Sequence, residues 1–270
     1  MRAQLKHLAI VSDNYLLLGH FYQALFGLRS FAGARPDGAI AVTDGYVGLN
    51  INPRAPGRQA GLDHFGFEVD DVETVFARVR KRYPQIAFLK RPSNRPFAGI
   101  SMHDPAGNVF DLSQRDMANR ADVYADDTLC RDRTARHIEH FMLRTLDPSG
   151  VARFYRDVFD LQELSGAHDD STHFLTDGVV TLIIAPWRIT DYVGSGIERP
   201  APDHIGFRVE SLAAFDNDLQ SLARRNPKLA PGPLGVGPES TMRQRLLATC
   251  RFGHHQLADP DGVLLDVSEG

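Results

Sequence analysis

The sequence predicts an α+β protein that consists of two tandem copies of one domain. Three observations lead to this prediction: the length, an internal repeat, and strands that alternate with single helices. The chain has 270 residues, which suggests two domains at about 100–200 residues per domain. Its composition, with 43% hydrophobic and 24% charged residues, is ordinary for a globular protein.

Five sequence blocks occur twice in the same order, which indicates an internal duplication. The paired blocks are LKHLAIV and IEHFMLR, FYQALFGL and FYRDVFDL, TDGYVGLNINP and TDGVVTLIIAP, LDHFGFEV and PDHIGFRV, and DPAGNVFDLS and DPDGVLLDVS. We therefore predict an N-terminal domain over 1–114 and a C-terminal domain over 137–270. The linker over 115–136 has mixed charges and no clear period.

Each copy is predicted to contain, twice over, a strand followed by a helix and short strands. Residues 15–26 have apolar side chains at i, i+3, i+4, i+7 and i+8, the spacing of one helix face. Gly27 follows where a helix commonly ends, and Asp44-Gly45 predicts a hairpin. The remaining elements predicted in the first copy are strands over 5–12, 39–43, 46–52, 62–69, 86–90, 98–103 and 108–113 and a helix over 72–82. Strands with one helix per module indicate α+β and not a doubly wound sheet.

Two repeated motifs are predicted to have structural roles. The FYxxxF motif lies on the apolar face of the first predicted helix of each copy, so we expect it in the core. In the Asp-Pro-x-Gly segments, Pro presets φ and Gly allows the turn before the last strand.

Charge and cysteine content exclude several classes of partner. The net charge of −4 and the pI of about 6.2 leave no basic excess to neutralise phosphates, so we expect no nucleic-acid partner. The only cysteines, Cys130 and Cys250, fit no metal-binding or redox spacing. We expect a reduced, cytoplasmic protein without signal peptide or membrane partner. The oligomeric state stays open, with a homo-oligomer as one alternative.

Strand alternation predicts where the histidines and aspartates of each copy point. On the strand 62–69, Phe65 and Phe67 share one face, which we expect to pack on the helix, and His64 has the opposite face. The same reasoning places two histidines and one carboxylate of each copy on the polar face. The predicted groups are His7, His64 and Asp111 in the first copy and His140, His204 and Asp266 in the second.

These residues resemble motifs of the vicinal-oxygen-chelate superfamily, which includes glyoxalases, bleomycin resistance proteins and extradiol dioxygenases. The likeness rests on a His in the first strand, a His in a DHxGF strand and an acid that closes DPxGxxxD, and it covers nearly all of 5–113 and 138–268. It implies two tandem domains, each of two βαβββ modules that form a cup-shaped sheet. It also implies metal ligands. The main set is His140, His204 and Asp266, and the second set is His7, His64 and Asp111. Family members usually have Glu where both copies here have Asp.

Two imidazoles and one carboxylate leave about three open positions on a divalent ion, which suits non-haem Fe(II) beside O₂ and a chelating substrate. The resemblance therefore implies an extradiol-type dioxygenase that acts on a small catechol-like or other chelating molecule. Fe(II) is the expected ion, with Mn(II) or Zn(II) as alternatives. The extradiol signature, however, places a Tyr three residues before Asp-Pro, where this chain has Gln256, and its upstream His is absent from 247–249.

Two other function classes stay open. A glyoxalase-type lyase or isomerase polarises a carbonyl at a metal. In the family this usually requires a fourth protein ligand at the positions that hold Asn50 and Ile183 here. A metal-free resistance-type protein would bind a small molecule in the same cup among aromatic side chains, and Trp187 is the only tryptophan.

The second copy has additional features, so we expect it to be the main active site. His254 and His255 precede the last turn and are candidates for acid–base catalysis. Because adjacent strand residues face opposite ways, at most one of them enters the cup. The segment 226–250 makes the second copy longer, and loops of this length are commonly lids or binding loops. Within it, Arg243 and Arg245 are candidates to meet an anionic group.

Overall fold

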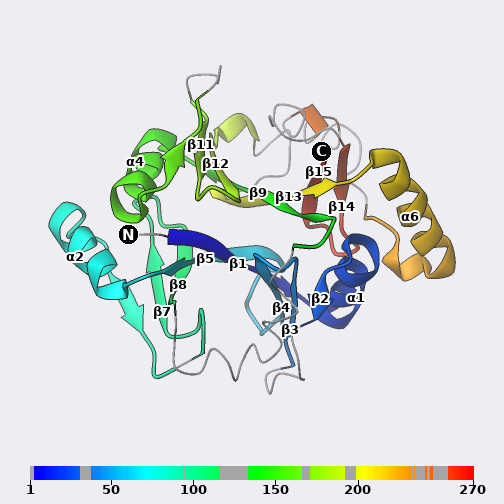
Figure 1. Ribbon diagram of the computed structural model, residues 1–270, viewed down its shortest axis with the longest axis horizontal. Helices are drawn as coiled ribbons and strands as arrows, with labels where there is room; N and C mark the ends of the chain where they lie inside the picture. Colours follow the sequence, from blue (N-terminus) through cyan, green and yellow to red (C-terminus); the bar gives the residue numbers. More distant parts are fainter. Residues whose placement is uncertain are drawn as a thin grey trace.

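The computed structural model contains two large mixed sheets flanked by helices (Figure 1). It describes residues 3–30, 38–93, 95–115, 133–165, 171–191, 199–232, 234, 241, 244–245 and 255–270. Within these residues, no helix is both long and apolar enough to cross a membrane.

The first sheet has eight strands in the order β2-β3-β4-β1-β5-β8-β7-β6. Its elements are β1 (Ala3–Ser12), α1 (Tyr15–Phe26), β2 (Arg29–Ser30), β3 (Ile40–Thr43), β4 (Gly48–Pro53), β5 (Gly61–Val69), α2 (Val72–Arg82), β6 (Phe88–Lys90), β7 (Ile100–His103) and β8 (Val109–Gln114). The central strands β1 and β5 are antiparallel, and each pairs in parallel with the last strand of its own module, β4 or β8.

The second sheet repeats this arrangement with seven strands in the order β10-β11-β12-β9-β13-β15-β14. Its elements are β9 (His137–Thr145), α4 (Pro148–Phe159), β10 (Gln162–Glu163), β11 (His173–Thr176), β12 (Thr181–Pro186), β13 (Ala201–Val209), α6 (Leu212–Arg225), the 3₁₀ helix η2 (Pro227–Leu229), β14 (His255–Ala258) and β15 (Leu264–Glu269). The predicted α+β class with two tandem copies is confirmed.

The proposed domain boundaries fall between the two sheets. Every strand of the first sheet ends by Gln114, and every strand of the second begins at or after His137. Most of the proposed linker, 116–132, lies outside the described residues.

Local signals explain where the principal helices begin and end. Helix α1 ends at Gly27, whose φ of 66° is the left-handed conformation that glycine adopts easily. Asp71 caps α2 by accepting from the backbone N–H groups of Glu73 and Thr74. Asp147 caps α4 in the same way, with Pro148 in its first turn.

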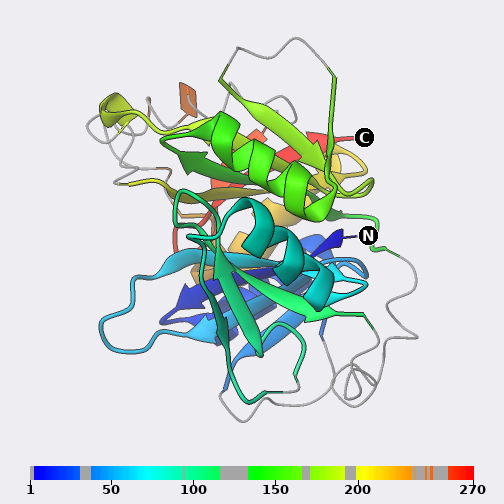
Figure 2. The same cartoon turned by 90° about the vertical axis from the view of Figure 1, so that its left-hand side faces the viewer.

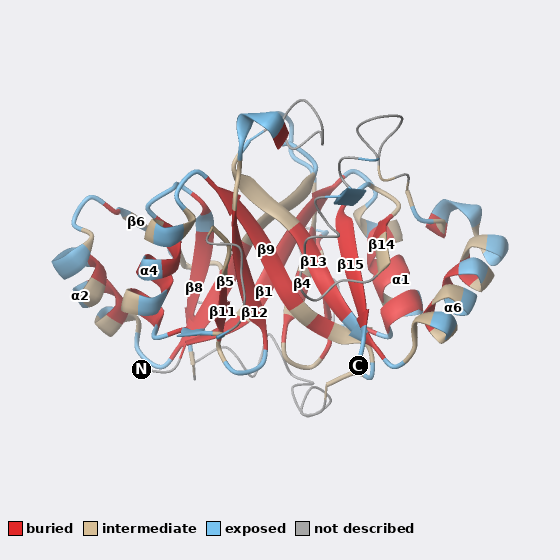
Figure 3. Ribbon diagram, turned by 90° about the horizontal axis from the view of Figure 1, so that it is seen from above, coloured by how far each residue is buried: buried red, intermediate tan, exposed pale blue. Residues whose placement is uncertain are grey.

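The two sheets pack face to face through their aromatic sides. Phe65 of β5 lies 5.1 Å from Phe141 of β9, centroid to centroid, so the sheets touch directly. At the two ends of this interface the helices pair, α2 beside α4 and α1 beside α6 (Figures 1 and 3). We call this inner side of each sheet the core face and the opposite side the cup face. Because the core faces meet, the two cup faces point away from each other.

The aromatic motif FYxxxF joins the domains. Phe26 of α1 stacks on Phe207 of the second sheet at 3.9 Å, and Phe159 of α4 stacks on Phe67 of the first sheet at 4.4 Å. The buried apolar residues on the core faces of both halves form one continuous cluster. The expectation that this motif lies in the core is confirmed, and that core is shared by the two domains.

The repeated turns also join the domains, which the sequence analysis did not predict. Asp44 in the β3–β4 turn accepts a hydrogen bond from Ile138 N at 2.9 Å, and Asp177 in the β11–β12 turn accepts one from Leu5 N at 2.7 Å. Each TDG turn therefore holds the first strand of the other domain. In Figure 2 the two domains form an upper and a lower layer, and the marks N and C lie on the same side of the molecule.

Candidate metal centres

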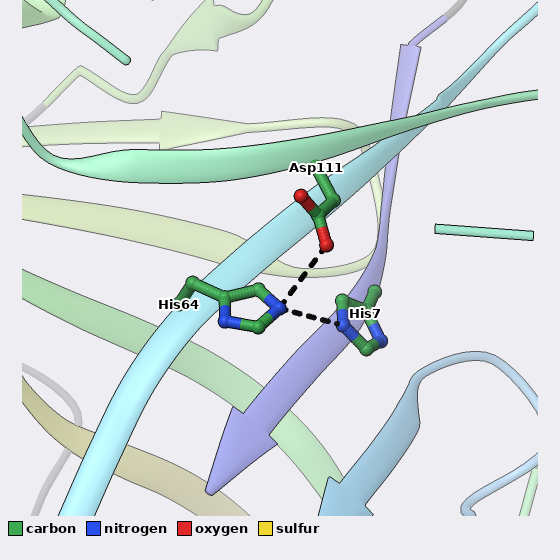
Figure 4. A group of neighbouring side chains, drawn as sticks. All are labelled: His7, His64 and Asp111. Atoms are coloured by element: carbon green, nitrogen blue, oxygen red, sulfur yellow. Dashed lines mark hydrogen bonds and ion pairs between the residues drawn. The ribbon is translucent and has the colours of Figure 1, made fainter. Parts of the chain in front are cut away.

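The first predicted triad comes together on the cup face of the first sheet, from β1, β5 and β8 (Figure 4). The Nε2 atoms of His7 and His64 are 3.3 Å apart, and His64 Nε2 lies 3.2 Å from Asp111 Oδ2. The His64 side chain is 20% exposed and that of Asp111 is 7% exposed, so solvent reaches this triad.

The second triad has the same arrangement on β9, β13 and β15. His140 Nε2 lies 3.2 Å from His204 Nε2 and 3.4 Å from Asp266 Oδ2, and the distance from His204 Nε2 to Asp266 Oδ2 is 3.9 Å. All three side chains are fully buried. The predicted convergence of three side chains is therefore present in both copies.

The spacing of the donor atoms is close to that required by a divalent ion, and only the 3.9 Å between His204 Nε2 and Asp266 Oδ2 is longer than expected. Two ligand atoms that each lie about 2.1 Å from one metal, at angles near 90–110°, are about 3.0–3.4 Å apart. Each triad offers two imidazole nitrogens and one carboxylate oxygen within 4.8 Å of one another. Both aspartates reach the histidines although Asp is one methylene shorter than Glu. Metal binding itself remains a prediction.

A β-bulge beside each triad explains its local geometry. On β5, His64 pairs with Ala9 and Leu62 with Ile10, so Asp63 is an extra residue without a counterpart on β1. The second sheet has the same shift, with Asp203 as the extra residue. A second pair of bulges interrupts β1 and β9 directly before His7 and His140.

The bulged aspartates orient the triad histidines. Asp63 Oδ2 lies 2.7 Å from His64 Nδ1, and Asp203 Oδ2 lies 3.1 Å from His204 Nδ1. When Nδ1 donates to a carboxylate, the lone pair of Nε2 is directed at the metal. Neither aspartate was predicted from the sequence as a functional residue. The signal that could have found them is the Asp-His dipeptide, which occurs at the same place in both copies.

Charged neighbours shift the pKa values of these groups. Burial lowers the pKa of His64, but the carboxylates of Asp111 and Asp63 outweigh it and raise the pKa to about 9. Burial raises the pKa of Asp203, but Arg144 and His204 outweigh it and leave the pKa well below its usual range. The carboxylates around His64 therefore favour positive charge at its imidazole, which a divalent ion would supply in place of a proton.

The glycine of the DHxGF motif is required by the neighbouring histidine. A Cβ atom on Gly206 would overlap the imidazole ring of His140. A Cβ atom on Gly66 would lie 2.9 Å from Phe97 Cδ1 and 3.2 Å from His7 Cβ, a milder conflict. The motif thus leaves room for the first histidine of each triad.

The carboxylate of each triad has a different neighbour on the adjacent strand. Asp111 accepts a short hydrogen bond from Ser101 Oγ, which in turn accepts from Arg91 Nη2 at 2.6 Å. Asp266 accepts from Gln256 Nε2 at 3.2 Å. Gln256 therefore stands beside a proposed metal ligand, at the position that holds Tyr in the extradiol signature.

The structure places His255 differently from what we expected of a catalytic residue. Its ring lies on the core face, 5.9 Å from the Phe215 ring, and its Nε2 is 3.3 Å from Asp216 Oδ1 of α6. The physical reason is strand alternation, since the neighbouring Gln256 occupies the cup face. His254 lies outside the described residues.

The segment 226–250 is described only in part. Its beginning forms η2, where Leu229 is buried beside α6. Arg245 is exposed, while Arg243 lies outside the described residues. The expectation that this segment closes over the cup falls mainly on residues that the structure does not describe.

The walls of the two cups differ in polarity. In the second sheet, buried apolar side chains cluster beside the triad, namely Met142, Phe174, Ile183 and Ala185, with Leu164 packed against them. The equivalent positions of the first sheet hold small or polar residues. The paired blocks of the repeat assign Ala9, Asn50 and Asn52, and strand register assigns Ala41, which pairs with Asn50 as Phe174 pairs with Ile183.

Comparison with known proteins agrees with this architecture. The family model described as Glyoxalase/Bleomycin resistance protein/Dioxygenase superfamily matches residues 137–267. A Mn(II)-bound glyoxalase from Novosphingobium aromaticivorans superposes with a TM-score of 0.64 at 15% identity, covering 99% of this chain and 82% of the other. A 2,2',3-trihydroxybiphenyl 1,2-dioxygenase from Sphingomonas wittichii strain RW1 gives 0.65 at 13% identity, with 100% and 91% covered. A comparison of the sequence with curated proteins found no match.

The C-terminal domain therefore belongs to the glyoxalase/bleomycin resistance/dioxygenase superfamily. The whole chain has the two-domain vicinal-oxygen-chelate fold that the sequence motifs predicted. Homoprotocatechuate 2,3-dioxygenase from Arthrobacter globiformis has it as well, with a TM-score of 0.63 at 14% identity and 100% and 80% of the two chains covered. At such identities the likeness concerns the fold.

Proposed function

We propose that this chain is a metal-dependent enzyme of the superfamily, and that its C-terminal cup acts as an extradiol-type dioxygenase. The observation that supports this best is the buried triad of His140, His204 and Asp266 beside an apolar wall. The proposed substrate is a small catechol-like or other chelating molecule. The proposed ion is Fe(II), with Mn(II) or Zn(II) as alternatives, and the N-terminal triad is proposed as a second metal site.

The donor set favours a reaction that needs several open metal positions. A divalent ion held by three protein ligands keeps about three positions for a bidentate substrate and O₂, which Fe(II) at such a triad activates. Ile183 occupies the position at which glyoxalase-type members supply a fourth ligand, and it is buried in the apolar cluster. This arrangement favours the dioxygenase over the lyase or isomerase alternative in the C-terminal cup.

The apolar wall suits a ring. Phe174, Ile183 and Met142 lie on the cup face of β11, β12 and β9, and Met142 pairs directly with His204 across the sheet. An aromatic ring whose two adjacent oxygens bind the metal would bury its carbon edge against these side chains. At about 25 cal/mol per Å², such burial contributes to affinity without any further polar contact.

Two residues of the chain position the ligands. Asp203 fixes His204 through Nδ1, and Arg144 holds that carboxylate at 3.1 Å. Gln256 fixes Asp266 through its amide. An amide has no proton to give or take near neutral pH, so Gln256 orients the carboxylate and does not act as an acid or a base.

The test is oxygen consumption by protein that has been loaded with Fe(II) without oxygen and then mixed with catechol and its substituted forms in air. We expect uptake of O₂ and a ring-opened product. His204→Ala should abolish the uptake, because it removes a metal ligand of the C-terminal cup. His64→Ala is the matched control in the other cup and should leave most of the activity.

Two results would contradict the proposal. Equal loss in the two variants, or loss only in His64→Ala, would show that the active cup is wrongly assigned. A full complement of Fe(II) with no O₂ uptake on any catechol, together with isomerisation of an α-oxoaldehyde adduct, would favour the lyase or isomerase alternative.

A further inference from the structure

We propose that the N-terminal cup is a second binding site, selective for small, polar, anionic chelators such as hydroxy- or oxo-carboxylates. The inference rests on the proposed function in one respect, because it requires a divalent ion at His7, His64 and Asp111. It goes beyond that function by assigning the two cups of one chain to different ligand chemistries.

The strand that forms the floor of the N-terminal cup is polar. On β4, Leu49 and Ile51 are buried in the core, so alternation places Asn50 and Asn52 on the cup face. The equivalent strand β12 presents Ile183 and Ala185 there. Amide groups hydrogen-bond polar substituents, whereas they would lose their water without compensation beneath an aromatic ring.

The floor of the N-terminal cup also leaves space for a small ligand between Asn50 and the triad. Ala9 and Ala41 stand where the other cup has Met142 and Phe174. Ala9 of β1 pairs with Asn50 on one side and with His64 on the other, so these three residues form one row across the sheet. Two strand spacings separate Asn50 from His64, about 10 Å between backbones. A molecule of a few carbon atoms spans that distance.

A positive charge lies beside the triad of the N-terminal cup, on the side of Asp111. Arg91 Nη2 donates to Ser101 Oγ at 2.6 Å and lies 3.6 Å from Asp111 Oδ1, while its Nε donates to Ala98 O at 3.0 Å. These contacts fix the guanidinium beside the triad, and its side chain is 42% exposed. A divalent ion and this arginine together outweigh the two carboxylates of Asp111 and Asp63, so the site has a net positive charge, which favours an anion.

The two triads differ in their accessibility to solvent. The His64 side chain is 20% exposed, whereas His140, His204 and Asp266 are fully buried. Phe97 stacks on His7 with the ring planes 8° apart and a centroid distance of 4.8 Å, which closes one side of the cup. The N-terminal triad is thus accessible to a ligand from solvent, and Phe97 covers one side of it.

The experiment measures oxalate binding to Zn(II)-loaded protein by calorimetry, with the zinc content determined on the same samples. His204→Ala leaves the N-terminal site and His64→Ala leaves the C-terminal site. We expect each variant to hold one zinc ion, and we expect oxalate to bind at least about tenfold more tightly to His204→Ala. Asn50→Ile, which introduces the residue of the other cup, should weaken oxalate binding about tenfold with zinc retained.

The reverse change, Ile183→Asn in the His64→Ala chain, should strengthen oxalate binding to the C-terminal cup. Equal oxalate affinity of His204→Ala and His64→Ala, or an unchanged affinity in Asn50→Ile, would overturn the inference. The proposed function would then still stand. Absence of zinc from His204→Ala would also overturn the inference, because the N-terminal triad would then bind no metal. The zinc content of His64→Ala tests the C-terminal metal site separately. Because Asn50→Ile alters no triad residue, it tests the inference even if a histidine variant fails to fold.

Discussion

At the residue scale, the geometry of each triad depends on β-bulges in the backbone as well as on the side chains themselves. Asp63 and Asp203 reach the histidines beside them only because each is the extra residue of a bulge. In a regular strand, adjacent side chains point to opposite faces and could not meet. The bulge therefore brings the carboxylate of the aspartate onto the histidine that follows it, so that the pair acts as a triad histidine and its orienting partner.

The glycine of the DHxGF motif provides a direct test of this geometry. Gly206→Ala should displace the ring of His140 and lower the metal content of the C-terminal triad, and it should cost about 1–3 kcal/mol of stability through overpacking. Gly66→Ala is the comparison in the other cup and should have a smaller effect, because its added Cβ would lie 2.9 Å from Phe97 Cδ1, 3.0 Å from Asp111 O and 3.2 Å from His7 Cβ and would not overlap a triad ring. The measurement is zinc stoichiometry together with denaturant unfolding. A fully loaded Gly206→Ala protein would show that the ring can move without losing the metal.

Alternation and the repeat were sufficient to predict which six residues form the triads. The orienting aspartates were not predicted, because strict alternation puts Asp63 and His64 on opposite faces. The repeated Asp-His dipeptide marks their position, but it does not reveal the bulge that brings the two side chains together. The same rule predicted that at most one of His254 and His255 enters the cup, and the structure puts His255 on the core face. The choice between the two was open because the register of the last hairpin was unknown.

At the scale of elements, each domain supplies a helix that supports the strand bearing the triad aspartate of the other domain. Tyr22 of α1 donates to Asp259 Oδ2 at 2.9 Å, in the turn before the strand that bears Asp266. Tyr155 of α4 donates to Asp104 Oδ2 at 3.1 Å, in the turn before the strand that bears Asp111. Burial raises the pKa of both tyrosines well above 10, so the phenols remain donors.

Removal of either phenol should destabilise the protein. Tyr22→Phe and Tyr155→Phe each leave a buried aspartate without its phenolic donor, and we expect a cost of about 1–3 kcal/mol in the free energy of unfolding. The measurement is urea unfolding followed by circular dichroism. Tyr83→Phe is a useful comparison, because its bond to Asp157 is only partly buried and should matter less. Costs of similar size at all three positions would contradict the argument.

The boundaries of the long elements followed from the sequence, because periodicity and caps mark them. Residues 15–26 and 72–82 form helices as predicted. The partners of these helices were beyond sequence analysis. The apolar stripe of α1 shows that the helix must be covered, but it does not show that Phe207 and Phe215 of the other domain help to cover it.

At the scale of the whole molecule, the shared core makes the domains interdependent. A fragment of residues 1–114 would expose Phe26 and Phe67, which stack on Phe207 and Phe159 in the complete chain. We expect this fragment alone to lack fixed tertiary structure or to self-associate, and to fold when mixed with residues 133–270. Near-ultraviolet circular dichroism and size-exclusion chromatography would measure both. A monomeric, cooperatively folded 1–114 fragment would show that the interface is dispensable.

The back-to-back packing of two similar sheets is the arrangement that a symmetric homodimer of a single such domain would have. In a homodimer, one coding sequence specifies both subunits, so any change that suits one pocket appears in the other as well. Duplication within one chain removes that constraint. Asn50 and Ile183, which occupy equivalent places, show that the halves have already diverged at their pockets while the aromatic contacts between them have been kept in both directions. Duplication within one chain thus keeps the interface between the domains symmetric and allows the two pockets to differ.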